Sequence, residues 1–139
     1  MKKLLLMMVT VITTSLLLVA CSSGDYNYIS AEEVKEKLEA NEDLVLLDIQ
    51  VEEEFEAHHI DGAVATYAYP TNSEEDYAKL APYVDQFKQS DDLVVIVCPA
   101  GGGGATRTYD YYIEQGVPEE QLFILEDGQQ GWPYDVVSN

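Results

Sequence analysis

The sequence predicts a single α/β domain built on a mostly parallel sheet of about five strands, with helices on both faces. Apolar runs without polar alternation, at 44–49 and 94–97, are typical of strands buried on both faces of a parallel sheet. Helical patterns separate these runs, as expected when a helix joins each strand to the next. The 119 residues from position 21 onward are the length of one domain with one core.

The first half of this domain is predicted from its caps and its apolar runs. Ser30 and Glu33 form a capping-box pattern, and Ile29 and Val34 are spaced as a hydrophobic staple, so a helix should begin at position 31. Asp48 falls at the carboxyl end of a buried strand, where a role as a helix cap or loop brace is favoured over catalysis. The expected elements are an edge strand at 26–29, a helix at 31–40, a strand at 44–49, a short helix at 52–57 and a strand at 63–66.

The second half continues the alternation. A helical pattern runs over 73–89, and Pro82 within it should kink the helix or start another. After the strand at 94–97, a helix that begins near Ala105 places Ala105, Tyr109, Tyr112 and Ile113 on one stripe and ends at Gly116. A last strand at 121–125 leads into a turn at 127–128.

Cys98 follows the strand at 94–97 and stands before a loop that contains four successive glycines. Ligands of parallel sheets bind at the carboxyl ends of strands, and glycine amides together with a helix N-terminus can hold an anion or a thiolate. We therefore expect Cys98 to be the catalytic nucleophile, although a cysteine at such a position can also be inert packing. The residues expected to bind substrate around it are Pro99, Ala100, Gly101, Gly102, Gly103, Gly104, Ala105 and Arg107.

The loop is a poor candidate for phosphate binding. A P-loop ends in Gly-Lys-Ser or Gly-Lys-Thr, and no such ending follows these glycines. The adjacent pair His58 and His59 has no further cysteine or histidine nearby, so hydrogen bonding within a loop is favoured over metal binding. We expect neither a metal nor another cofactor.

The N-terminus predicts export and lipid attachment. Two lysines precede an apolar run over 4–20, which is the layout of a secretory signal. The run ends in Leu18-Val19-Ala20-Cys21, which resembles the bacterial lipobox and implies cleavage before Cys21 and attachment there of diacylglycerol with acyl chains such as palmitate. A retained membrane-spanning helix is the alternative, but 17 residues are at the lower limit. The predicted organisation is a signal peptide at 1–20, a lipid-anchored tether at 21–27 and the domain at 28–137, on the extracytoplasmic face of a bacterial cell membrane.

The net charge and the cysteine content limit the kinds of partner that the chain is expected to bind. The formal net charge is −19 and becomes −21 once the leader lysines are removed, which argues against binding to nucleic acid or anionic headgroups. Cys98 has no intramolecular disulfide partner if Cys21 is lipidated. A lone thiol outside the cytoplasm is exposed to oxidation, so its presence favours a functional use. We expect a monomer.

Three ordered motifs resemble the rhodanese domain. Asp48-Ile49-Gln50, followed by Glu54-Phe55 and His59-Ile60-Asp61-Gly62-Ala63, is similar to the first signature of that family. Cys98 stands where the family has its nucleophile, and the segment from Leu125 to Trp132 is similar to the closing motif. The resemblance implies a five-stranded sheet flanked by helices and a persulfide on Cys98. The residues expected to support the site structurally are Asp48, His59, Gly62 and Trp132.

The chain departs from the family at its loop. Pro99 and Gly103 stand where the usual Cys-Arg-x-Gly-x-Arg loop has arginines, and Gln50 replaces the arginine after Asp48. Anion binding would then rest on backbone N–H groups, the helix terminus and Arg107.

The expected function is transfer of a sulfane sulfur through Cys98, from thiosulfate or a persulfide donor to a thiol or cyanide. Its substrate would be a small sulfur compound or a protein thiol. The alternative is a binding or thiol redox-sensing module at the cell envelope. Phosphatase chemistry on the same fold needs Cys-x5-Arg, and that position is Gly104, so the phosphoryl group would lack its bidentate clamp.

Overall fold

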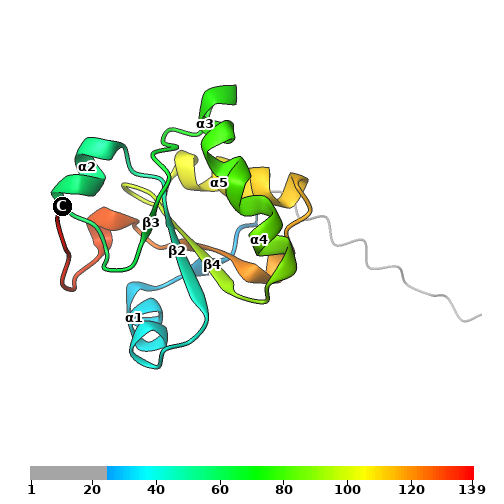
Figure 1. Ribbon diagram of the computed structural model, residues 1–139. Coiled ribbons are helices and arrows are strands. Elements are labelled where there is room, and N and C mark those ends of the chain that lie inside the picture. The colour runs from blue at the N-terminus through cyan, green and yellow to red at the C-terminus, as the bar shows by residue number, and fades with distance from the viewer. Residues whose placement is uncertain (1–24) are drawn as a thin grey trace, which may run out of the picture.

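The computed structural model describes residues 25–139, which form one sheet with helices packed on it (Figure 1). Its strands are β1 Tyr28–Ile29, β2 Leu44–Asp48, β3 Val64–Ala65, β4 Leu93–Val97 and β5 Leu122–Leu125. Its helices are α1 Ala31–Glu39, α2 Glu52–Ala57, α3 Glu74–Leu80, α4 Val84–Gln89 and α5 Gly103–Glu114. Short 3₁₀ helices lie at Ala81–Tyr83, Glu119–Gln121 and Gln129–Gly131.

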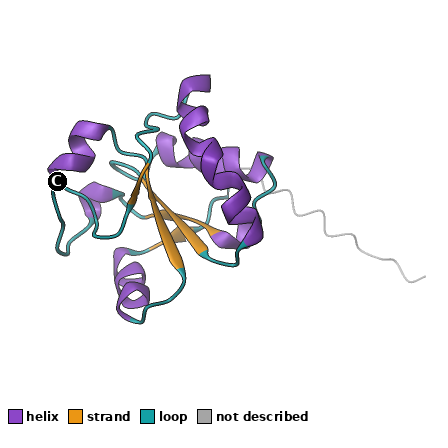
Figure 2. Cartoon of the chain, in the orientation of Figure 1, coloured by secondary structure: helices purple, strands orange, loops and turns teal. Residues whose placement is uncertain are grey.

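The five strands form one parallel sheet in the order β1-β5-β4-β2-β3. Strand β4 lies at the centre and pairs with β2 over the run from Leu44 opposite Leu93 to Asp48 opposite Val97. Figure 2 shows the strands converging toward the edge at which the loops to α2 and α5 begin. The predicted fold class is confirmed, and the ends of β2 and β4 come side by side at that edge.

Helices cover both faces of the sheet because the central strand is apolar in both directions. Val94 and Ile96 pack with the side chains of α3, α4 and α5, including the fully buried Phe87 and Tyr112. Val95 and Val97 point to the opposite face and pack with residues of the β1–α1 segment. Alternate residues of one strand therefore anchor two separate cores.

The start of α1 matches the predicted capping box. The Ser30 hydroxyl accepts from the Glu33 N–H at 3.2 Å, and the Glu33 carboxylate accepts from the Ser30 N–H at 3.2 Å. Ile29 and Val34, the predicted staple, are both buried in the same apolar cluster. These contacts fix the direction in which the chain leaves β1.

The helical pattern over 73–89 divides at Pro82, as predicted, into α3 and α4 with a 3₁₀ turn between them. Two other features differ from the sequence prediction. Helix α5 begins at Gly103, two residues earlier than predicted. Ile113 is 37% exposed and does not belong to the buried stripe of α5, whereas Tyr109 and Tyr112 do.

The predicted signal peptide at 1–20 and the predicted lipidation site Cys21 lie outside the described residues. Within residues 25–139, none of the helices combines the length and the apolar character needed to cross a lipid bilayer.

Replacing Ser30 with alanine should lower the free energy of unfolding by about 1 kcal/mol, because the first turn of α1 loses its side-chain acceptor. Urea unfolding followed by circular dichroism measures this loss. Ser138→Ala, at an exposed position near the C-terminus, is the control and should leave the unfolding midpoint unchanged. Equal midpoints for both variants would show that the capping box does not contribute.

Candidate active site

Cys98 lies where the sequence analysis places it, directly after β4 at the carboxyl edge of the sheet. Its side chain is buried, with 1% of the residue exposed, and it is a free thiol. The Gly101 N–H donates to the Cys98 sulfur at 2.8 Å. One amide of the glycine loop therefore points inward and offers a hydrogen-bond donor to charge on the sulfur.

The loop that carries Cys98 is fastened to the segment that follows β5. The Gln129 N–H donates to the Cys98 carbonyl at 2.8 Å, and the Gln130 N–H donates to the Pro99 carbonyl at 3.0 Å. Gly128 has a φ of 58° and a ψ of −154°, in a region that only glycine adopts readily. A Cβ there would overlap the Cys98 carbonyl oxygen and would lie 2.6 Å from the Gly101 nitrogen. The close approach of the two segments therefore requires glycine at 128.

The remaining glycines divide between the loop and the helix. Gly102 caps α5, and Gly103 and Gly104 form its first turn, where backbone N–H groups have no partner within the helix. Gly104 and Ala105 are buried, and a Cβ on Gly104 would lie 2.8 Å from the Tyr69 ring. These two residues face the protein interior rather than solvent.

Arg107 serves a neighbouring loop. Its Nε donates to the carbonyl oxygens of Pro70 at 3.2 Å and Thr71 at 3.0 Å, and its Nη2 donates to Pro70 at 2.8 Å. Its Nη1 lies 2.8 Å from the place where a Cβ of Gly103 would stand. The guanidinium thus reaches back one helical turn and lies over Gly103, where the family loop has an arginine. Its hydrogen bonds hold the 69–71 loop beside α5.

Asp48 binds the first residues of the loop that follows β2. Its buried carboxylate accepts from the Gln50 backbone N–H at 2.9 Å and from the Gln50 side-chain amide at 3.0 Å. Burial raises the pKa of Asp48, and the hydrogen bonds from Gln50 offset that effect only in part. The pKa of Asp48 is therefore higher in the folded protein than in the unfolded chain. As the pH rises from the unfolded pKa through the folded pKa, ionisation of Asp48 lowers the free energy of unfolding.

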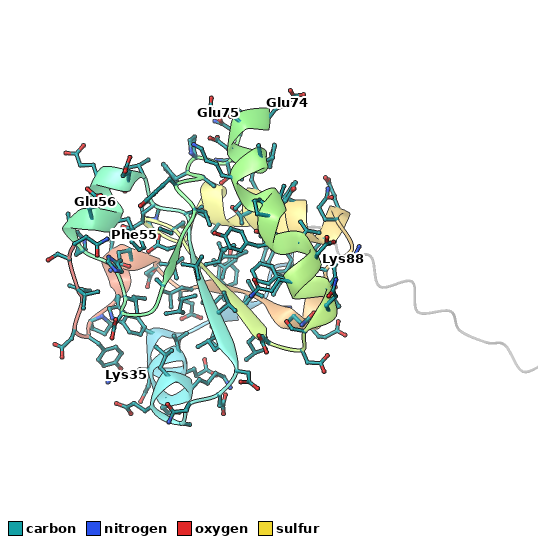
Figure 3. All side chains as sticks on the ribbon, viewed as in Figure 1. Lys35, Phe55, Glu56, Glu74, Glu75 and Lys88 are labelled. Atoms are coloured by element: carbon teal, nitrogen blue, oxygen red, sulfur yellow. The ribbon has the colours of Figure 1, made fainter. Side chains whose placement is uncertain are left out.

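The other residues expected to support the site are His59, Gly62 and Trp132. Trp132 packs against the apolar cluster that contains Ile60, the residue that follows His59. The His59 ring is 2.7 Å from the Phe55 carbonyl through Nδ1 and stacks on the Phe55 ring at 3.8 Å between centroids. Figure 3 shows Phe55 on α2, and the residue is buried whereas its neighbour Glu56 is exposed. Gly62 has a φ of 84°, and a Cβ added there would meet no atom within 4 Å. The imidazole of His59 is therefore engaged in packing.

A small pocket beside Pro99 contains residues that sequence reasoning did not select. Its volume is about 130 Å³. The side-chain amide of Gln129 is buried without a hydrogen-bond partner and belongs to its lining. The other lining residues are Gln50, Glu54, His58, Pro99 and Gln130. Sequence reasoning singled out Pro99, as a substrate-binding residue, and Gln50, as the residue in place of a family arginine; the fold brings the other lining residues beside them.

No group of three or more histidine, cysteine, aspartate or glutamate side chains within residues 25–139 is arranged to hold a metal ion.

A protein-family model, described as the rhodanese-like domain, matches residues 30–134. The chain belongs to the rhodanese-like domain family. The match spans the elements from α1 to the segment after β5, so it includes both Cys98 and the turn that fastens its loop. A comparison with curated protein sequences finds no match.

Solved structures support the same fold. A rhodanese-like domain from Anabaena superposes with a TM-score of 0.64 at 16% identity, over 83% of this chain and 81% of that one. A rhodanese-like domain protein from Staphylococcus aureus gives 0.63 at 18% identity, over 81% and 98%. A thiosulfate sulfurtransferase from Pseudomonas aeruginosa gives 0.65 at 20% identity, over 81% of this chain and 20% of that one. At these identities the likeness establishes the rhodanese-like fold.

Replacing Gly128 with alanine should destabilise this rhodanese-like domain by about 3 kcal/mol, because strain at positive φ and overlap with the Cys98 carbonyl act together. Gly62→Ala is the matched control, since Gly62 also has positive φ but open space around it, and it should cost about 1 kcal/mol. Chemical unfolding of both variants measures the difference. Equal costs would mean that the Cys98 loop does not need the close approach at Gly128.

Proposed function

We propose that this rhodanese-like domain is a sulfurtransferase that carries a sulfane sulfur as a persulfide on Cys98. The observation that supports it best is the Gly101 N–H directed at the Cys98 sulfur at 2.8 Å, at the carboxyl edge of a parallel sheet. Helix α5 begins five residues after Cys98, so its positive end adds to the stabilisation of a thiolate.

The reaction proceeds in two displacements on sulfur. The Cys98 thiolate attacks the outer sulfur of the donor, the donor S–S bond breaks, and the rest of the donor leaves with the electron pair, as sulfite from thiosulfate or as a thiolate from a persulfide. An acceptor thiolate or cyanide then attacks the outer sulfur of the Cys98 persulfide. The Cys98 thiolate is the leaving group of that second step and is thereby regenerated.

A persulfide donor fits this site better than thiosulfate. Thiosulfate carries two negative charges, and the chain has a net charge of −19. The guanidinium of Arg107 is engaged by the carbonyls of Pro70 and Thr71, and the loop positions 99 and 103 carry no charge. The loop therefore has no free charged side chain to bind the thiosulfate dianion. A persulfide donor carries less negative charge at its sulfur atoms and needs less positive charge to balance it.

A second candidate function is binding or redox sensing without sulfur transfer. The observation behind it is that the loop lacks the family arginines at positions 99 and 103, which a sulfurtransferase loop would use to hold an anionic donor. In this alternative Cys98 cycles through sulfenic acid when an oxidant reaches it.

We place this activity at the extracytoplasmic face of a bacterial cell membrane, with the domain held by lipid on Cys21. The support is the lipobox-like sequence that closes the apolar run at 4–20. The acceptor in that setting is a small thiol or a thiol on another protein.

Incubation with thiosulfate or with cysteine persulfide should add one sulfur atom to the native protein, as measured by intact mass. The addition should be absent from Cys98→Ser, and cysteine persulfide should act faster than thiosulfate. If no donor adds sulfur but peroxide oxidises Cys98, the sensing function is selected. Equal sulfur addition to Cys98→Ser would end the assignment of sulfur transfer to this residue.

Replacing Pro99 with arginine should raise kcat/KM for thiosulfate by about 10-fold, because a charge-assisted hydrogen bond to the dianion is restored. Gln115→Arg, at an exposed position beyond the end of α5, makes the same change in net charge and should have no such effect. Steady-state rates with thiosulfate and with cysteine persulfide separate the two cases, since only thiosulfate should benefit.

A further inference from the structure

A second and larger pocket lies between α1 and the segment that follows β5. Its volume is about 530 Å³, within the range of sites that hold small molecules. None of its lining residues belongs to the Cys98 loop. The lining residues are Lys35, Leu38, Glu39, Ile60, Asp61, Trp132, Pro133, Tyr134 and Asp135.

Two aromatic rings form a corner in this pocket. The rings of Trp132 and Tyr134 lie 5.1 Å apart between centroids and are inclined at 77°. The indole N–H of Trp132 donates to the Asp135 carbonyl at 3.2 Å, which holds the ring in place. The faces of such rings carry partial negative charge and attract cations, and ring corners of this kind recognise substituted ammonium groups.

The Tyr134 ring of this corner already lies beside an ammonium group of the chain itself. The Lys35 Nζ lies 5.1 Å from the centroid of the Tyr134 ring and 2.7 Å from a carboxylate oxygen of Glu39. The hydrogen bond to Glu39 raises the pKa of Lys35, so this group is cationic at neutral pH. Figure 3 shows Lys35 on α1 at the surface of the molecule, and its side chain is only partly buried.

The pocket carries more negative charge than Lys35 balances. Glu39, Asp61 and Asp135 line it, so three carboxylates face one ammonium group. Leu38, Ile60 and Pro133 supply apolar walls that suit the methyl or methylene groups of an organic cation. The net charge of the whole chain also draws cations toward the surface from a distance.

We propose that this pocket binds an organic ammonium group, of the lysine side-chain or choline type, in the aromatic corner that Lys35 occupies when no ligand is present. The ligand's ammonium group packs on the rings of Trp132 and Tyr134, its alkyl groups contact the apolar walls, and the carboxylates compensate its charge. Lys35 is then a competitor within the chain that sets the affinity. This site is independent of sulfur transfer at Cys98.

The test uses the fluorescence of Trp132, which is the only tryptophan of the chain. The protein is titrated with choline and, separately, with N-acetyl-lysine amide at constant ionic strength. Each should produce a saturable change, and the tighter ligand identifies whether the source is a small quaternary amine or a lysine of a polypeptide. The uncharged isostere 3,3-dimethyl-1-butanol should produce no saturable change.

Lys35→Gln should bind the ammonium ligand about 3-fold more tightly, because the competing group is gone. Lys37→Gln is the matched control: Lys37 also lies on α1 and also pairs with a glutamate, Glu42 at 3.0 Å, but it is not part of the pocket. It should leave the affinity unchanged. Tyr134→Leu keeps the fluorescent reporter and should weaken binding about 3-fold or more.

The proposal is overturned if neither ammonium ligand changes the fluorescence beyond the neutral isostere. It is also overturned if Lys35→Gln and Lys37→Gln shift the affinity equally, since that result would indicate a long-range effect of charge. A loss of binding in Glu74→Gln/Glu75→Gln would have the same meaning, because these residues lie on α3 at the far end of the molecule from Lys35 (Figure 3).

Discussion

The arrangement around Cys98 depends on one backbone contact, the hydrogen bond from the Gln129 N–H to the Cys98 carbonyl. It joins the loop after β4 to the turn after β5, beyond the last paired residues of the two strands, so the turn helps to shape the loop. With the carbonyl held from that side, the Gly101 N–H turns toward the sulfur. The Cys98 thiol is thus oriented by main-chain groups, which need no charged side chain and are insensitive to pH.

The sequence predicted the sheet and its helices because their signals are local. The capping box at Ser30 predicts the start of α1, and the uninterrupted apolar runs predict β2 and β4, each from a few consecutive residues. It also placed Cys98 correctly, since a residue that ends a central parallel strand must lie at the carboxyl edge of the sheet. The family match at 30–134 agrees with the resemblance carried by the short motifs.

What the sequence did not predict depends on contacts between distant segments. A substrate-binding role for Arg107 stays a prediction, but its Nε and Nη2 bind the carbonyls of Pro70 and Thr71, which are 37 and 36 residues away. The lining of the small pocket by Gln129 and His58 has the same origin. The start of α5 was misplaced because glycine has poor helix propensity, whereas at a first turn its cost is outweighed by the packing of the residues that follow.

The strands at the two margins of the sheet, β1 and β3, are only two residues long. A long margin would offer a row of free N–H and C=O groups to any neighbouring chain, and such rows are where sheets join and aggregate. Edge strands of two residues leave few unpaired N–H and C=O groups to which a neighbouring chain can add a strand. Copies of this chain held densely side by side could therefore remain separate folded units.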